Sequence, residues 1–330
     1  MPLRAFDDAD RSVDASLLSP AEWAALTATN RAVRQLRTMC CGSRVALKTS
    51  RLGTRFFAHL ALGGCASGDE GPEHLHLKAL AIVAARAAGW EAQAEVTGAT
   101  PGGEAWRADV LATRGRHRVA VEVQWSGQAD DETFRRQARY AASGVRGLWL
   151  FRRQGFLNDA GVPAVRVTGS LGQGLTILGL PAAEALAAVF ARRLRFGIPA
   201  GAVAPVNVHG GVASCWGLGC GAINRGVVAV EVTFAASRAV LDLAAFGDHL
   251  PLLTSLLPSD PARGRIRRRP DRTAVAGCFR CDRPLTRFSP RSRFTIVHAS
   301  LAVTGDWAAL IAAQPDFLPA WGIAPATANA

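Results

Sequence analysis

The sequence is poor in lysine. Only Lys48 and Lys78 are lysines, so arginine supplies nearly all of the positive charge, which gives a net charge of +12 and a pI near 10.7. A strongly basic protein often has a polyanionic partner such as nucleic acid. Arginine bias together with abundant alanine and glycine also fits a GC-rich genome, and in that case the charge indicates only a solvated basic surface.

Long apolar segments are lacking as well. No run approaches the roughly 20 residues that a membrane-spanning helix needs, and the start of the chain (MPLRAFDDADRSVD) has no apolar core of a signal peptide. The sequence therefore predicts a cytoplasmic protein without a membrane partner. Its 330 residues, 49% of them hydrophobic and 19% charged, can bury a sizeable core and exclude a disordered chain. Seven cysteines in a reducing compartment favour thiols or metal ligands over a disulfide framework.

Periodicity and breaker residues divide the chain into four predicted segments: 1–70, 71–155, 156–205 and 206–330. The first carries a helical pattern over 20–37 and short strands around Gly42 and Gly53. The third carries one strand and one helix, expected near 163–167 and 181–195. A Pro/Gly-rich joint near 198–211 leads into the C-terminal segment.

The second segment has the clearest pattern. Helices are expected over 73–89 and 129–144, and outer strands near 91–96 and 146–152. Asp130 is the expected N-cap of the second helix, and Gly89 and Gly144 follow the last turns. Two strands joined by a tight turn lie between the helices. The predicted order is helix, strand, strand, strand, helix, strand, which is an α/β fold with an αβββαβ core.

The hairpin in this segment brings acidic residues together. Gly115 and Arg116 fit a two-residue type II′ turn, because glycine supplies the positive φ of the first turn position. This turn sets Asp109 directly opposite Glu122. Paired residues share a face with Cβ atoms about 5 Å apart, so Gln124 lies on that face as well.

Two carboxylates in this arrangement repel one another and need a positive neighbour. Mg²⁺ or Mn²⁺ prefers oxygen ligands, and such an ion activates water and stabilises charge on a phosphodiester. The alternative is a plain ion-paired hairpin, in which Arg107 or Arg118 neutralises one carboxylate. The hairpin alone leaves both interpretations open.

The succession of RADV, VAVEVQ, RRQARY and GLWLF resembles the competence protein CoiA-like family, a branch of the PD-(D/E)XK nuclease superfamily. The resemblance is strongest over residues 71–153. It implies a restriction-endonuclease-like core, in which Asp109 is the metal-binding acid and Glu122 is the acid of the E-x-K element. Gln124 stands where most members have lysine, and it would orient the attacking water without adding a charge.

The resemblance also implies roles for the start of the first helix, which carries PEHLHLK. Glu73 and His74 would approach the metal site, and Lys78, one turn after His74, would contact phosphate. Without the family, a histidine in this position is as well explained by a structural role, and His76 is a weaker candidate.

On the second helix, Arg136 and Tyr140 lie four residues apart and match a pair in the family. They would bind the nucleic acid backbone, and a helix-surface contact is the alternative.

The C-terminal segment contains two close cysteine pairs, C-x4-C and C-x2-C. Four thiolates delivered by two tight turns suit a structural Zn²⁺ in a zinc-ribbon-like region, with unliganded thiols as the alternative. The ligands would be Cys215, Cys220, Cys278 and Cys281. Between the pairs, the arginine-rich residues 261–272 either bind phosphates or form a disordered loop.

A second cysteine set lies near the N-terminus: Cys40, Cys41, His59 and Cys65. CoiA-like proteins often carry a cysteine ribbon followed by an FAH element, and residues 57–59 read FAH. Adjacent cysteines depart from the usual ribbon spacing, so this set is a candidate for a degenerate ribbon.

The predicted function is that of a Mg²⁺- or Mn²⁺-dependent nuclease acting on DNA. The main alternative is a non-catalytic nucleic-acid-binding protein that has kept a nuclease fold and a zinc ribbon. A zinc-dependent transcription regulator is a third reading, and it would require sequence-selective binding by residues 206–330 alone.

Overall fold

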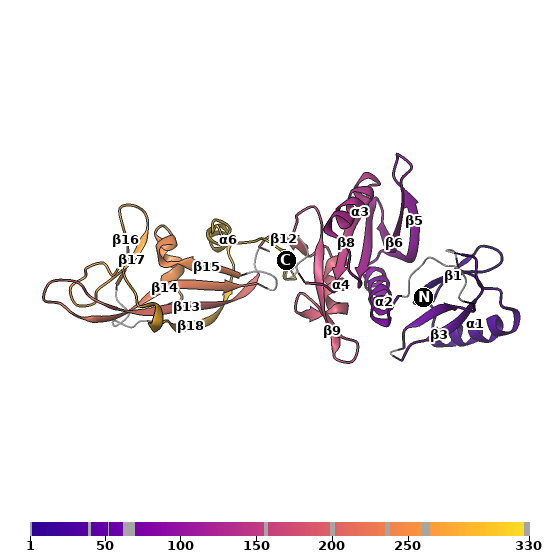
Figure 1. Ribbon diagram of the computed structural model, residues 1–330, viewed down its shortest axis with the longest axis horizontal. Coiled ribbons are helices and arrows are strands. Elements are labelled where there is room, and N and C mark those ends of the chain that lie inside the picture. The colour runs from indigo at the N-terminus through magenta and orange to yellow at the C-terminus, as the bar shows by residue number, and fades with distance from the viewer. Residues whose placement is uncertain are drawn as a thin grey trace. The chain divides into compact units, whose positions relative to one another are not determined.

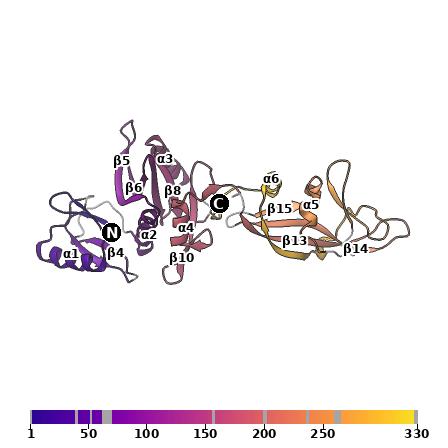
Figure 2. The same ribbon diagram turned by 180° about the vertical axis from the view of Figure 1, so that it is seen from behind.

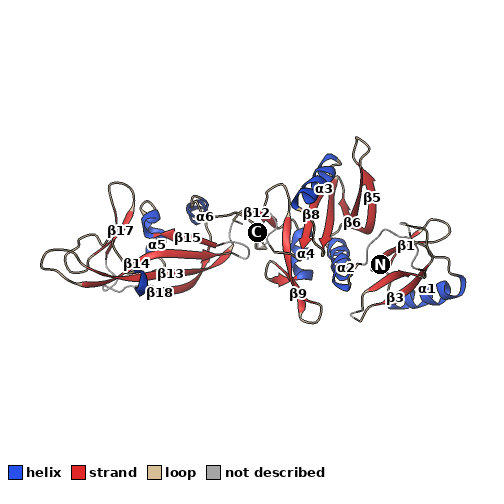
Figure 3. Cartoon of the chain, viewed as in Figure 1, coloured by secondary structure: helices blue, strands red, loops and turns tan. Residues whose placement is uncertain are grey.

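The computed structural model describes residues 2–38, 41–51, 53–61, 70–154, 158–198, 202–234, 238–258 and 265–326. The chain divides into two compact units, Met1–Leu194 and Arg195–Ala330. The described residues form a mixed α/β protein with six α-helices and one large seven-stranded sheet (Figure 3). None of the helices in these ranges is long and apolar enough to cross a membrane.

The N-terminal part of the first unit is small and has its own core around Trp23 and Phe57. Its elements are β1 (Arg4–Phe6), β2 (Ser12–Asp14), α1 (Pro20–Val33), β3 (Val45–Thr49) and β4 (Arg55–His59). Helix α1 begins with a capping box, in which Ser19 and Glu22 each satisfy the other's backbone amide. It is shorter than predicted because Arg34 adopts a left-handed φ of 49° and ends the helix.

The order predicted for residues 71–155 is present in the structure. The elements are α2 (Pro72–Ala87), β5 (Glu91–Ala99), β6 (Ala105–Arg114), β7 (His117–Gln124), α3 (Asp130–Ala142) and β8 (Arg146–Phe151). Strands β5, β6 and β7 are antiparallel neighbours, and β8 lies parallel to β7. This part of the chain therefore has the αβββαβ order that its periodicity indicates.

The same sheet continues beyond the predicted core (Figure 1). The added elements are β9 (Ala164–Ser170), β10 (Gly174–Ile177), β11 (Leu180–Pro181) and α4 (Ala182–Phe190). The strand order is β11-β10-β9-β8-β7-β6-β5. Trp90 joins α4 to the core, because its indole nitrogen donates to the Phe190 carbonyl at 3.1 Å and the two rings lie 5.8 Å apart.

The hairpin register is the predicted one from Arg114 and His117 back to Val110 and Val121, but the predicted pairing of Asp109 with Glu122 is absent from the described β6–β7 pairs. Arg114 pairs with His117, and Gly115 has a φ of 56°, as the first position of a type II′ turn requires. The paired residues run back from the turn to Val110 and Val121, where the pairing of β6 with β7 ends.

The predicted N-cap of α3 is wrong. Ala129 occupies the N-cap position without a side-chain hydrogen bond, and Asp130 is the first helical residue. The Asp130 carboxylate instead forms an ion pair with Arg153. An acid in the first turn still complements the helix dipole, although it does not cap the helix.

The second unit is built on a four-stranded sheet with the order β15-β14-β13-β18. These strands are β13 (Val203–Ser214), β14 (Ile223–Thr233), β15 (Arg238–Asp242) and β18 (Phe294–Ala302). Helices α5 (Leu250–Thr254) and α6 (Gly305–Ala312) lie on one side of the sheet (Figure 2), and η1 (Leu243–Phe246) directly follows β15. They add Phe246, Leu253 and Trp307 to its core. Smaller elements are β12 (Leu194–Phe196), β16 (Arg265–Arg268), β17 (Ala274–Gly277), η3 (Pro290–Ser292) and β19 (Trp321–Ile323).

Two expectations for this unit need correction. The joint predicted over 198–211 is largely strand, because β13 includes Gly210 and Gly211. A Cβ at Gly210 would lie 2.7 Å from the Ile296 side chain, so glycine here avoids a close contact within the sheet and does not mark a turn. The arginine-rich segment is partly ordered, since β16 pairs with β17, while residues 261–264 lie outside the described residues.

Candidate active site and cysteine cluster

Asp109 lies on β6 next to the last residue pair of the β6–β7 hairpin. Its side chain, in place of a backbone carbonyl of β6, accepts a hydrogen bond from β7. Its Oδ2 accepts a hydrogen bond from the backbone N–H of Val123 at 2.8 Å. Burial favours a raised pKa for Asp109. The nearby His74 imidazole, the charge of Lys78 and the Val123 amide outweigh burial and hold the pKa of Asp109 well below its usual range. Asp109 is therefore ionised and fixed in position.

Three side chains lie close to Asp109: Glu70, just before the N-cap of α2, and His74 and Lys78 on the helix itself. Glu70, His74 and Lys78 are spaced four residues apart, which puts them on one side of the helix start. His74 Nε2 lies 3.4 Å from Asp109 Oδ2 and 3.8 Å from Glu70 Oε1. Lys78 is fully buried and donates to Glu70 at 3.0 Å and to Glu95 at 2.9 Å. Although burial alone would lower it, the three carboxylates raise the pKa of Lys78 above its ordinary value.

The donor set of Glu70, His74 and Asp109 fits a divalent metal ion. One ligand atom from each residue lies within 4.8 Å of the others. The His74 Nε2 atom is buried and has no hydrogen-bond partner among the described residues. A buried imidazole nitrogen without a partner is costly, and a bound cation would satisfy it.

Glu122 is held by a different helix. Its two carboxylate oxygens accept hydrogen bonds from Arg136 and from the Tyr140 hydroxyl, both on α3. Burial raises the pKa of Glu122 to about 8, and the charge of Asp109 adds to this effect, while Arg136 and Tyr140 oppose it. The two carboxylates thus influence one another electrostatically, although one is bonded to residues of α3 and the other contacts α2.

Other residues predicted from the sequence have different neighbours. Gln124 donates from its side-chain amide to the Ser126 carbonyl at 3.1 Å. His76 Nδ1 lies 3.3 Å from the Thr54 hydroxyl, and burial lowers the pKa of His76. Glu73 is half-buried, and the metal-binding group contains Glu70 in its place.

Glu70 and Glu95 were not predicted from the sequence, and Arg136 and Tyr140 were predicted as nucleic acid contacts instead of partners of Glu122. Glu70 stands in a Gly/Asp/Glu-rich stretch that has the composition of a linker. The spacing of Glu70, His74 and Lys78 is the signal that could have identified it.

A surface groove with a volume of about 490 Å³ is lined by residues of β5, β6 and α3. Its lining includes Trp106, one acid, Glu132, and three arginines, Arg107, Arg136 and Arg139. Arg136 connects the groove to the site, because it also binds Glu122. The groove therefore has an excess of positive charge and is linked to the Glu122 carboxylate through Arg136.

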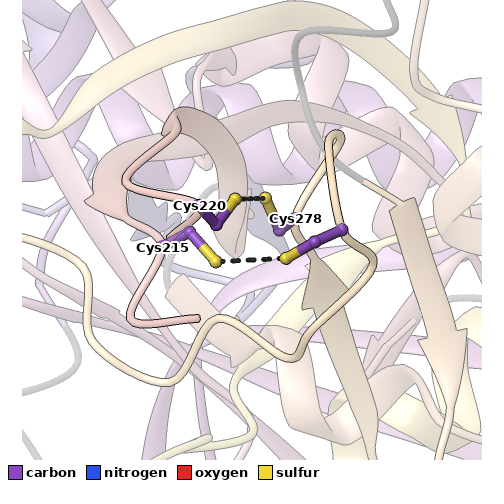
Figure 4. Close-up of side chains that lie close together, drawn as sticks. Cys215, Cys220 and Cys278 are labelled. Carbon is purple, nitrogen blue, oxygen red and sulfur yellow. Dashed lines mark hydrogen bonds between the residues drawn. The ribbon is translucent and has the colours of Figure 1, made fainter. Parts of the chain in front are cut away.

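The four C-terminal cysteines meet in one cluster (Figure 4). The sulfur atoms of Cys215 and Cys281 lie 3.4 Å apart, and those of Cys220 and Cys278 lie 3.8 Å apart. Cys215 and Cys220 come from the loop between β13 and β14, and the other pair follows β17. The cluster could hold a metal ion.

Backbone amides point at these sulfurs. Gly217 N–H donates to Cys215 Sγ at 3.4 Å, and Arg280 N–H donates to Cys278 Sγ at 3.4 Å. Burial favours a raised pKa for Cys278, but the amides of Cys281 and Arg280 outweigh it and lower the pKa to about 6. Such amides stabilise a thiolate, which is the form that binds metal.

Of the N-terminal set, the structure describes two members. Cys41 Sγ lies 3.4 Å from His59 Nε2. Cys40 and Cys65 lie outside the described residues. A metal site in this set stays a prediction.

Residues 70–160 match the family model described as competence protein CoiA, nuclease-like domain. This segment is similar in sequence to the CoiA nuclease-like domain. The resemblance stated from the sequence motifs is confirmed over this range. No curated protein and no solved structure gave a significant match to the chain. The CoiA-like segment contains every residue of the acidic site, while the cysteine cluster lies outside it.

Proposed function

We propose that the CoiA-like domain is a divalent-metal-dependent nuclease that hydrolyses phosphodiester bonds in DNA on a PD-(D/E)XK-type core. The observation that carries this proposal is the buried His74 Nε2 atom, which lacks a hydrogen-bond partner in the described part of the chain and faces two carboxylates. A structural ion-paired hairpin would not need this arrangement. A cation site explains it.

Glu70, His74 and Asp109 would hold Mg²⁺ or Mn²⁺, with Glu122 as a further carboxylate beside them. When bound, such an ion lowers the pKa of a water and stabilises charge on the phosphate. The Val123 amide holds Asp109 in place, and Lys78 holds Glu70.

The residue at the E-x-K position is Gln124, which brings no charge. Lys78 supplies a buried positive charge to the same site from α2 and is fully enclosed. Its bonds to Glu70 and Glu95 support a positioning role in place of the phosphate contact expected from the sequence.

The groove linked to Glu122 supports a nucleic acid substrate. Arginine binds phosphate oxygens in a bidentate manner, and Arg107, Arg136 and Arg139 line this groove. Arg136 contacts Glu122 and also lines the groove, so phosphate binding by Arg136 would alter its ion pair with Glu122. Tyr140 is 1% exposed and binds Glu122, which supports a positioning role for this side chain.

For the second unit we propose a structural Zn²⁺ at the cysteine cluster. Four sulfurs within 4.8 Å, two close pairs on tight turns and amides directed at the thiolates all suit tetrahedral zinc.

The test is incubation of purified protein with labelled linear, circular and single-stranded DNA, with and without Mg²⁺ or Mn²⁺. Asp109→Asn and Glu122→Gln should each reduce divalent-dependent cleavage by at least about a hundredfold. Asp109→Asn removes a carboxylate charge from the metal site, and Glu122→Gln removes the carboxylate that Glu122 forms above its pKa of about 8. Asp131→Asn changes an exposed acid on α3 and should cleave like the parent protein. Undiminished cleavage by both site variants would refute the assignment.

The second candidate is a non-catalytic nucleic-acid-binding module. Arg136 and Tyr140 bound to Glu122, together with Gln124 in place of lysine, favour it. It predicts binding without cleavage in either ion, and an affinity that does not change with Asp109→Asn.

A further inference from the structure

Large apolar side chains surround the cysteine cluster on the outside of the protein. Trp216 follows Cys215 and is 61% exposed, and Phe279 follows Cys278 and is 47% exposed. Leu218, in the first cysteine loop, is fully exposed. Single exposed apolar side chains are common, but a group of large ones at one place usually marks an interaction surface.

Arginines accompany these side chains. Residues 265–293 contain ten arginines and two aspartates. The Arg283 guanidinium lies 5.1 Å from the centre of the Trp216 ring, and Arg280 donates to the Cys220 carbonyl at 3.3 Å. Asp282, between them in sequence, forms an ion pair with Arg267. The knuckle surface is defined here as Trp216, Leu218, Phe279, Arg280 and Arg283.

Hydrogen bonds hold the Trp216 ring and the backbone at Phe279. The Trp216 indole nitrogen donates to the Pro284 carbonyl at 3.0 Å, and the Phe279 backbone amide donates to the Asn224 side chain at 2.9 Å. Each of the two residues directly follows a clustered cysteine, so a metal bound by the four sulfurs would fix the backbone that carries both rings. A fixed backbone reduces the conformational entropy lost on binding.

We propose that the knuckle surface binds single-stranded nucleic acid, with bases stacked on Trp216 and Phe279 and phosphates bound by Arg280 and Arg283. Unpaired bases expose flat faces that stack on aromatic rings, whereas a duplex hides them. The excess of arginine complements the phosphate charge. This site lies outside the CoiA-like domain, and it depends on neither the acidic site nor cleavage.

The experiment uses the full-length, zinc-loaded Asp109→Asn protein without Mg²⁺. A fluorescein-labelled single-stranded oligonucleotide and the duplex of the same sequence are titrated by fluorescence anisotropy. Trp216→Leu and Phe279→Leu keep an apolar side chain but remove the ring, and each should weaken single-strand binding about 5- to 100-fold. Trp216→Phe should keep most of the affinity. Arg283→Ala should reduce the slope of log affinity against log salt by about one.

Matched controls lie in the same unit. Leu318, 70% exposed, and Arg238, with a 63% exposed side chain, stand outside the knuckle surface. Leu318→Ala and Arg238→Ala should bind like the parent protein. Zinc content is measured for every variant and shows whether the cluster is intact. If a Leu variant loses zinc, the affinities of Trp216→Phe and Arg283→Ala are compared with that of the parent protein in its place.

Unchanged affinity in both Leu variants with zinc retained would refute the proposal, and so would equal affinity for the duplex. A protein that binds single strands through these rings but cleaves no DNA supports this inference and refutes the nuclease. If the protein cleaves DNA and its single-strand affinity is the same without either ring, the nuclease is supported and this inference is refuted.

Discussion

Asp109 and Val123 form a hydrogen bond between a side chain and a strand amide, at 2.8 Å, at the point where the β6–β7 pairing ends. Asp109→Ala would leave that amide without its acceptor and should destabilise the protein by about 1–3 kcal/mol. Asp109→Asn retains a carbonyl oxygen that can accept from this amide, so it should lower the unfolding free energy by less than Asp109→Ala does. Urea denaturation of the two variants measures the difference, and equal stabilities would show that the amide does not need this partner.

Lys78 should be essential for stability, while Lys48 should not. Replacing buried Lys78 by methionine leaves Glu70 and Glu95 without their shared cation, which should cost about 3–5 kcal/mol. Lys48 is exposed on β3, so Lys48→Met should change the unfolding free energy by less than about 0.5 kcal/mol. These are the only two lysines of the chain. Equal effects of both changes in urea denaturation would contradict the buried cation.

Glu122 should make stability depend on pH. Its pKa is about 8 in the folded protein, whereas a glutamate in an unfolded chain titrates near about 4.3. Between these values the unfolded chain loses a proton that the folded protein keeps. The contribution of Glu122 to the unfolding free energy is therefore largest in acid and falls as pH rises from about 4.5 to about 8. Urea denaturation of the parent protein and of Glu122→Gln over this pH range measures the contribution of Glu122. Identical pH profiles of the two proteins would contradict a raised pKa of Glu122.

The cost of removing Arg136 should depend on pH as well. At pH 6 Glu122 is protonated, and Arg136→Ala should cost about 1–3 kcal/mol for a lost hydrogen bond. At pH 9 the variant leaves a buried carboxylate charge without its partner, so the cost should be larger. Arg135 is 67% exposed in its side chain and pairs with Glu132, and Arg135→Ala should have a small effect at both values. A cost for Arg136→Ala that does not grow with pH would contradict an ionising Glu122.

Zinc should bind at the C-terminal cluster. Cys220→Ser combined with Cys278→Ser should remove one equivalent of zinc per chain and lower the thermal stability of the protein, because the thiolates supply folding energy through the metal. Cys41 lies outside this cluster, and Cys41→Ser should retain that equivalent. Metal analysis and calorimetry measure both effects. Full zinc content in the double variant would exclude the site.

Much of the core could be predicted because its signals are local. The turn at Gly115 fixes the hairpin register, and apolar periodicity with Gly89 and Gly144 identifies the two helices. The cysteine pairs were also predictable, since their spacing marks two tight turns. The coarse arrangement therefore follows from short stretches of sequence.

The remaining features depend on contacts between distant parts of the chain. Tyr140 and Arg136 face Glu122 because of how α3 packs on the sheet, and a helical pattern does not say which strand residue a helix contacts. Glu70 was overlooked because the stretch around it has the composition of a linker. Gly210 resembles a breaker in sequence, and only the packing of Ile296 against it explains the strand.

The enclosed ammonium of Lys78 also bears on the amino-acid usage of the chain. Arginine stands for lysine almost everywhere in this sequence, yet the fully enclosed cation that two carboxylates share is a lysine. An ammonium is a compact cation with three donors, whereas a guanidinium is planar and larger. Lys78→Arg is therefore expected to be less stable than the parent protein in urea denaturation, although it keeps the charge.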